Sequence, residues 1–525
     1  MKKSTCLVLT AALASTMLFS SCGDGDTGKT DVNLDSYPIE TDTTLTYWMA
    51  LDSSLTTTVT NYGDTFFAKE LAERTGVNVK YIHPTLGQEG EAFNLMVASN
   101  DLPDIIEATW SGAMAGGPAA ALNGQVIIPL NDLMAKYAPA LSKYLSENPD
   151  MDREVKLDDN KYYAFPHIRG DSSLLVSAGP IIRQDWLDEL GIAAPKTIND
   201  WENMLTAFKE KKGAIAPFSI ASTQREAMFA IVGSGYNFYV DGKSIKFAPL
   251  EPEFKTAVET LHRWFEKGLL DPNYTLVDST LLDSNILNGF TGATYGSGGS
   301  NLGKWLASSG NENIDLVGIS MPLNQHGQTN EFSKLSNYYS TYGAAITTAC
   351  KNPGLAAKYL DYNYTEDGAI LNNFGVEGTT FDYIDDYPTY KDVIMKNPEG
   401  LTTSQAMANY FRASRSGPFV QDKRYIMQYY ALDQQKEALS NWEQGSDVAL
   451  ANKIPNIVLL SNETSEYSNI FNEIQKYRDE SVVAFINGTK SMDQFDDFVQ
   501  TLEKMNAKRA IEIQQAAYDR YLNRK

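Results

Sequence analysis

Between residues 45 and 106 the spacing of the apolar residues switches repeatedly between the period of a strand and the period of a helix. This pattern restricts the possible fold more than any other feature of the chain. Apolar residues recur at every second position in some segments and every three to four positions in others, as with Phe67 and Leu71. The predicted elements are strands at 45–49, 77–81 and 104–106 and helices at 64–74, capped by Asp64 and stopped by Gly76, and at 91–98. Strands separated by helices predict a doubly wound α/β lobe with parallel pairing.

A second α/β region is predicted after residue 166. A short apolar strand at 181–182 ends at Asp185, which is expected to cap the helix beyond it. Thr197 and Asp200 have the spacing of a capping box. Further amphipathic helices are predicted from Trp201, Leu205 and Phe208, from Phe254, Val258, Leu261 and Phe265, from Asn352-Pro353 onward, and from Phe495, Phe498 and Leu502. The 525 residues exceed what one hydrophobic core holds, so two lobes are expected.

The N-terminal end has the pattern of an export signal. Lys2 and Lys3 precede an apolar stretch at 7–19 that is too short to cross a bilayer. Small residues then lead directly into Cys22, which resembles a bacterial lipidation site, so residues 1–22 are expected to be a signal with a lipid anchor at Cys22. Ordinary secretory cleavage is the alternative, and it also predicts export. The polar segment 23–43 is predicted to be a flexible tether.

Composition excludes several classes of function. The net charge of −22, without any dense run of Lys or Arg, argues against binding nucleic acid or an anionic membrane surface. Beyond the signal, no window offers eighteen uninterrupted apolar residues, so membrane attachment is expected through the lipid alone. After Cys6 and Cys22, the remaining chain keeps only Cys350 and therefore has no internal disulfide.

The motifs of common enzymes are absent. The four histidines are scattered without metal-ligand spacing, so no metal is expected, and the glycine-rich segment 292–299 lacks the Lys-Ser/Thr of a P-loop. No GxSxG sequence occurs. Because sequence does not show whether two carboxylates lie close together, a polysaccharide hydrolase stays an alternative.

Seven motifs resemble one known family, the family 1 extracellular solute-binding proteins of bacterial carbohydrate ABC importers, in the long lipoprotein branch. They are GVNVKYIHP at 76–84, LMVASNDLPDII at 95–106, KYYAFP at 161–166, IRQDWLDELGI at 182–192, WFEKGLLDPNY at 264–274, NPGLAAKYLDYNYTEDG at 352–368 and NNFGVEGTTFDY at 372–383. The resemblance implies a type II periplasmic-binding fold, with two α/β lobes, a hinge and a ligand between them. It also implies a monomer that delivers a carbohydrate to ABC permease subunits, without enzymatic activity and without a cofactor.

One segment departs from the family pattern. Many long members carry an Asp/Asn-rich calcium loop after the helix that is predicted here to end at Lys211, whereas this chain continues Lys-Gly-Ala-Ile-Ala-Pro. These residues offer too few oxygen ligands for a calcium cage. Calcium is therefore not expected at this position.

Ligand contacts are predicted just beyond the ends of strands and in loops that permit close approach. Indole and phenol rings stack on the apolar face of a sugar, and arginine donates a fork of hydrogen bonds. The predicted ligand-binding residues are Trp48, Trp110, His167, Arg169, Tyr236, Tyr295, Trp305 and, from its family motif, Glu377. Core packing, a surface ion pair or a turn is the alternative role for each.

The expected division places 44–168 and 340–368 in lobe I and 169–339 and 369–525 in lobe II. A peptide, a polyamine or a uronate-type sugar is the alternative ligand within the same fold, and a surface adhesion or sensor protein is the alternative that involves no transport.

Overall fold

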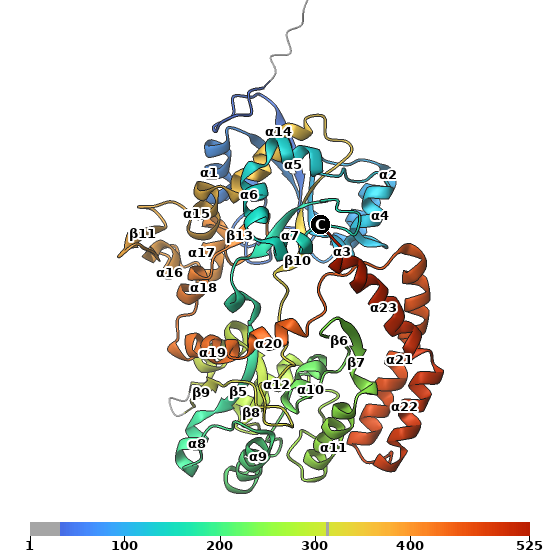
Figure 1. Ribbon diagram of the computed structural model, residues 1–525. Coiled ribbons are helices and arrows are strands. Elements are labelled where there is room, and N and C mark those ends of the chain that lie inside the picture. Colours follow the sequence, from blue (N-terminus) through green and yellow to red (C-terminus); the bar gives the residue numbers. More distant parts are fainter. Residues whose placement is uncertain (1–31, 311–313) are drawn as a thin grey trace, which may run out of the picture.

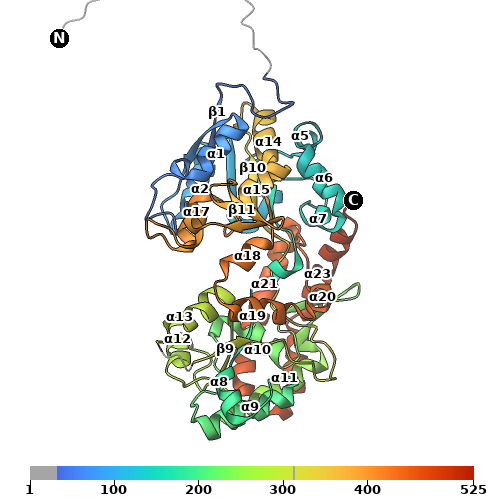
Figure 2. The same ribbon diagram turned by 90° about the vertical axis from the view of Figure 1, so that its left-hand side faces the viewer.

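The computed structural model describes residues 32–310 and 314–525, and these form two lobes stacked one above the other (Figures 1 and 2). The predicted lipidation site at Cys22 and residues 23–31 of the predicted tether lie outside the described residues. The prediction of a tether is wrong for the end of that segment, which packs on lobe I. Ile39 is 2% exposed in the core and its amide donates to the carbonyl of Thr75 at 2.8 Å, and the hydroxyl of Tyr37 donates to the carbonyl of Lys358 at 2.6 Å. No helix in the described ranges is both long enough and apolar enough to cross a membrane. The expected two-lobe α/β architecture is confirmed.

Lobe I is built on a mixed sheet with the strand order β13-β4-β10-β3-β1-β2. Its strands are β1 (Thr44–Trp48), β2 (Asn78–Ile82), β3 (Ile105–Thr109), β4 (Phe165–Arg169), β10 (Tyr339–Ile346) and β13 (Val420–Gln421). The parallel pairing of β1 with β2 and β3 confirms the predicted strand–helix–strand unit, whereas β10 runs antiparallel to both β3 and β4.

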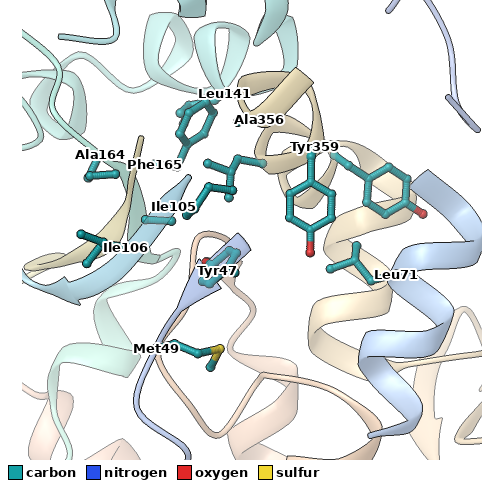
Figure 3. Packing of buried hydrophobic residues seen from close by; sticks show 14 of the residues in the cluster. Tyr47, Met49, Leu71, Ile105, Ile106, Leu141, Ala164, Phe165, Ala356 and Tyr359 are labelled. Atoms are coloured by element: carbon teal, nitrogen blue, oxygen red, sulfur yellow. The ribbon is translucent and has the colours of Figure 1, made fainter. Parts of the chain in front are cut away.

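Helices cover both faces of this sheet. They are α1 (Phe66–Thr75), α2 (Glu89–Ser99), α3 (Trp110–Ala113), α4 (Gly117–Asn123), α5 (Asn131–Tyr137), α6 (Pro139–Glu147), α7 (Pro149–Glu154), α14 (Pro353–Asp361), α15 (Glu366–Phe374), α16 (Asp392–Met395) and α17 (Thr403–Tyr410). The cap of α1 is Thr65 rather than Asp64, because the Thr65 hydroxyl accepts the Ala68 amide and Asp64 belongs to the preceding turn. Side chains of β1, β3, β4, α1, α6 and α14 converge in one core (Figure 3).

Lobe II has a smaller central sheet with the order β8-β5-β9, all antiparallel. Its strands are β5 (Ala178–Arg183), β8 (Ala293–Ser297) and β9 (Leu316–Gly318), with a separate hairpin of β6 (Phe238–Asp241) and β7 (Ser244–Phe247). Among the described residues of lobe II, parallel pairing, which the doubly wound pattern predicted here, occurs only as single bridges, of Phe218 with Leu270 and Ala293 and of Thr197 with Leu323. The capping box of Thr197 and Asp200 is confirmed.

The helices of lobe II surround this sheet and then form a wall on one side of the molecule (Figure 1). They are α8 (Gln184–Leu190), α9 (Ile198–Lys212), α10 (Arg225–Ile231), α11 (Pro252–Glu266), α12 (Ser279–Leu287), α13 (Lys304–Ser308), α19 (Asp433–Glu443), α20 (Ser446–Ala451), α21 (Ser461–Ile486), α22 (Phe495–Lys504) and α23 (Ala507–Leu522). The predicted core faces are confirmed in α9, α11 and α22, where only Phe265 is partly exposed.

The lobe boundary differs from the expected one at residue 369. The chain from 369 to 425, expected in lobe II, packs in the core of lobe I through residues such as Leu371 and Phe411. It includes the hairpin of β11 (Phe381–Ile384) and β12 (Tyr387–Tyr390), and β13 at the sheet edge. Helix α18 (Arg424–Tyr429) then leads into lobe II. An amphipathic pattern shows that a helix has a core face but does not show which of two cores receives it.

The last helix, α23, joins lobe II back to lobe I. Its Tyr518 and Tyr521 pack against β6 and β7. At the same end of the chain, Arg520 and the buried Arg524 donate to Asp158, which follows α7 in lobe I, at 2.9 and 2.7 Å. Figure 2 shows the end of the chain beside α7. The lobes are therefore connected by crossing segments and also by this noncovalent strap.

Candidate functional site

A cavity of about 440 Å³ lies between the lobes, against the segments that cross from one to the other. Lobe I contributes residues that follow its strands, and lobe II contributes the segment before β10 and the segment after α20. Its polar lining consists of Ser111, Glu154, Lys156, Tyr163, Arg169, Ser336, Asn337, Ser340, Thr341, Lys453 and Asn456. Cavities of about 700 and 370 Å³ share Lys453 with it, so these spaces adjoin one another.

The topology of lobe I places these groups together. Because β3 and β10 are antiparallel, the end of β3 meets the start of β10, which brings Ser111 beside Thr341 with their hydroxyl oxygens 2.6 Å apart. Arg169 ends β4, the other neighbour of β10. In open α/β sheets ligands bind just beyond the ends of strands, and this cavity occupies that position.

The charged groups of the cavity are held by neighbours on both lobes. The guanidinium of Arg169 donates to the carbonyl of Asn337 at 2.7 Å, and the ammonium of Lys453 donates to that of Leu335 at 2.6 Å. Burial lowers the pKa of both side chains. Glu154 accepts from the amide of Asn456 and from Tyr521, both at 2.8 Å. Burial raises the pKa of this carboxyl.

The two tryptophans predicted to contact ligand in lobe I are core residues in this structure. Trp110 is fully buried, and its indole N–H donates to the carbonyl of Gly343 at 3.0 Å. Trp48 is 7% exposed and, like Trp110, packs edge-on against Phe93. Their faces are thus occupied by protein, and a role in stacking on a ligand stays a prediction.

The three aromatic residues predicted in lobe II are also buried. Tyr236 lines the 370 Å³ cavity, but its hydroxyl donates to Asp479 at 2.6 Å. The guanidinium of Arg478 lies 4.1 Å from the centroid of the Tyr236 ring. Tyr295 donates to a backbone carbonyl at 3.2 Å. The N–H of Trp305 donates to an aspartate, Asp283, at 2.6 Å. Glu377 is exposed in the turn before β11, away from the inter-lobe cavity residues.

His167 is buried on β4, against Phe419, and does not line the cavity. Burial, followed by the charges of Arg169 and Arg412, lowers the pKa of His167 to about 3. Of the eight predicted residues, Arg169 is the one that lines the cavity between the lobes.

This histidine predicts a pH dependence of stability. In the unfolded chain the pKa of His167 is roughly 6.5, whereas in the folded chain it is about 3. Between these two values the unfolded chain binds a proton that the folded chain does not bind, so the free energy of unfolding falls as the pH drops below about 6.5. At pH 5 the loss is about 2 kcal/mol relative to pH 7.5. Thermal unfolding of wild type and His167→Phe at both pH values measures it. An equal loss in the variant would show that other groups cause the effect.

Sequence reasoning missed Ser111, Asn337, Thr341 and Asn456. They occur singly, in segments that lie far apart in the sequence, and carry no motif that marks a site. The only available signal was the position of Ser111 a few residues after the predicted strand at 104–106. In the described residues, no grouping of three or more His, Cys, Asp and Glu side chains has a metal-binding arrangement.

Comparisons with known proteins give consistent results. The family model of bacterial extracellular solute-binding proteins matches residues 53–370. The fructooligosaccharide ABC transporter substrate-binding protein FusA of Streptococcus pneumoniae serotype 4 is 28% identical over 398 residues, 71% of this chain and 70% of its own. The lipoprotein LipO of Bacillus subtilis is 21% identical over 460 residues, 83% and 85% of the two chains. The alginate-binding protein AlgQ2 superposes with a TM-score of 0.67 at 24% identity, covering 91% of this chain and 99% of AlgQ2.

Proposed function

The chain belongs to the bacterial extracellular solute-binding proteins, and from this premise we propose that it captures an oligosaccharide between its lobes and delivers it to an ABC permease. The family is described as extracellular and solute-binding, and FusA is named as the substrate-binding protein of an ABC transporter. The proposal of a carbohydrate ligand is supported by FusA, which its name describes as a fructooligosaccharide transporter's binding protein.

One observation carries the proposal: the cavity of about 440 Å³ is lined by both lobes and by the segments that cross between them. A ligand bound there touches both half-sites at once, so it stabilises arrangements in which the lobes are close together. Its lining of amides, hydroxyls and charged groups matches the hydroxyl groups of a sugar, which both donate and accept hydrogen bonds. Binding breaks no covalent bond, and we assign the protein no enzymatic step.

A uronate-type oligosaccharide is the second candidate ligand. Lys156, Arg169 and Lys453 line the cavity, against one carboxylate, Glu154. Cations stabilise an acidic sugar, and AlgQ2, which shares the fold, is described as alginate-binding. This excess of positive groups stands out in a chain whose net charge is −22.

Thermal unfolding in the presence of candidate ligands tests the proposal. The panel contains fructooligosaccharides, alginate oligosaccharides, a peptide mixture and spermidine. A ligand that binds only the folded state adds about 2.7 kcal/mol at a hundredfold excess over its dissociation constant, which raises the Tm. A rise with fructooligosaccharides or alginate oligosaccharides, with the sugar recovered intact, supports the proposal. A rise with the peptides or spermidine alone, or hydrolysis of the sugar, contradicts it.

Replacement of Arg169 is expected to weaken binding of that sugar at least tenfold. The methionine in Arg169→Met keeps much of the side-chain volume but removes the donors, and a tenfold loss corresponds to about 1.4 kcal/mol. Isothermal titration calorimetry measures the dissociation constant. Arg74→Met, at an exposed ion pair with Asp367 on the surface of lobe I, is the matched control and should bind like wild type. If Arg169→Met bound the sugar as tightly as Arg74→Met, Arg169 would not contribute to ligand binding.

We further propose that the protein is a monomer anchored to the membrane by lipid at Cys22. The support is the sequence pattern around Cys22 and the similarity to LipO, which is named a lipoprotein. Cys22→Ser is expected to shift the protein from the membrane fraction to the medium or soluble fraction of the producing bacterium. Incorporation of a fatty-acid label into wild type but not into Cys22→Ser is the direct measurement; labelling of both would contradict the proposal.

A further inference from the structure

Thr341, on the wall of the inter-lobe cavity, has a backbone φ of +59°. A β-branched residue in this left-handed region is a conformational outlier, because its side chain crowds the backbone. Glycine takes such a φ without steric cost, and asparagine does so more readily than most residues. The chain thus places an unfavourable residue type at the mouth of its candidate site.

The residues around Thr341 impose this conformation. On one side, the carbonyl of Tyr339 accepts from the side-chain amide of Asn456 at 2.7 Å. On the other, the hydroxyl of Tyr342 donates to the buried Glu107 at 2.7 Å. The register between β10 and β4 shifts across this stretch, so the backbone leaves the regular ladder here. Strain of this kind persists where the surrounding structure fixes it, and such sites cluster where ligands bind.

The result is a pair of hydroxyls presented to the cavity. The oxygens of Thr341 and Ser111 lie 2.6 Å apart, and Ser111 is exposed. Each hydroxyl has one donor and two acceptor positions, so the pair keeps hydrogen-bonding capacity after bonding to itself. Thr341 lies near the start of β10, and Ser111 lies in α3, directly after the end of β3. The antiparallel pairing of β3 with β10 therefore holds the two residues side by side.

We propose that Thr341 and Ser111 form a specificity-determining pair that binds a ring hydroxyl of the sugar, and that Thr341 is kept in its strained conformation for this contact. This inference rests on the proposed function. A site built to hydrogen-bond one hydroxyl strongly disfavours ligands that lack it or point it elsewhere. The pair therefore adds affinity only for sugars that place a hydroxyl within its reach, and in this way determines which sugars bind.

Three variants test the pair, with Tm and calorimetric affinity measured for each. The probes are fructooligosaccharides and alginate oligosaccharides, used in parallel. Thr341→Gly relieves the strain and removes the hydroxyl, so its Tm should rise while its affinity falls at least tenfold. Thr341→Ser keeps the hydroxyl and should bind within threefold of wild type. Ser111→Ala removes the partner hydroxyl at an unstrained position and should lose affinity without gaining stability.

The outcomes separate this inference from the proposed function. If wild type binds neither sugar probe, the proposed function fails and the role given to Thr341 fails with it. If wild type binds but Thr341→Gly binds equally well, the pair does not contact the ligand and the inference is overturned. A Thr341→Gly protein that is no more stable than wild type overturns the claim that a strained residue is retained for binding.

Discussion

Glu107→Ala is expected to lower the free energy of unfolding of lobe I by about 3–5 kcal/mol, because it leaves a buried guanidinium without its carboxylate. Glu107 is 1% exposed and accepts two hydrogen bonds from Arg412, at 3.1 and 2.5 Å. Tyr47 and Tyr342 donate to the same carboxylate at 2.5 and 2.7 Å. Burial, and then the charge of Glu107, raises the pKa of both tyrosines well above the usual value, which keeps them protonated as donors.

Urea unfolding monitored by tryptophan fluorescence and by circular dichroism measures this loss. The control is Glu466→Ala, which removes an exposed carboxylate paired with Arg509 in lobe II and should leave the free energy of unfolding nearly unchanged. Similar losses in the two variants would mean that the buried network adds no more than a surface pair. The network also fixes the start of β10, so Glu107→Ala should disturb the inter-lobe cavity as well.

Trp110→Ala is expected to cost about 3–5 kcal/mol, the range for removing a fully buried large side chain. Its indole fills the core below α3 and donates to Gly343 on β10, so the variant loses packing and a buried hydrogen bond. Thermal unfolding without ligand measures the effect, with Leu95→Ala as the control because Leu95 is 71% exposed. If the Trp110→Ala protein were as stable as wild type but failed to bind sugar, the indole of Trp110 would be a ligand contact rather than a core residue.

The general architecture was predictable because it depends on short-range periodicity. Parallel strands β1 to β3 and the core faces of α9, α11 and α22 all follow from spacings within about a dozen residues. The capping box at Thr197 also needs only four consecutive positions. Information of this range is fully present in a single sequence.

The candidate site was mostly not predictable, because it depends on contacts between distant segments. Ser111 meets Thr341 through an antiparallel pairing of β3 with β10 that no local pattern specifies. Aromatic residues near strand ends were expected to contact ligand, whereas Trp110 and Trp305 satisfy their N–H groups within the protein. A large ring at a strand end has the same sequence pattern whether it faces a cleft or the core.

The strap formed by α23 has a consequence for how the chain reaches its final form. The sheet of lobe I includes β13, and its edge loop at Asp158 is held by Arg520 and Arg524, more than 360 positions further along. Because a chain is synthesised from its N-terminus, lobe I cannot be completed until nearly all of the chain has been made. Such non-local contacts make folding slow, and the unfinished lobe exposes unpaired strand edges in the meantime. Completion of lobe I therefore follows the synthesis of lobe II, although lobe I contains the first part of the chain to be made.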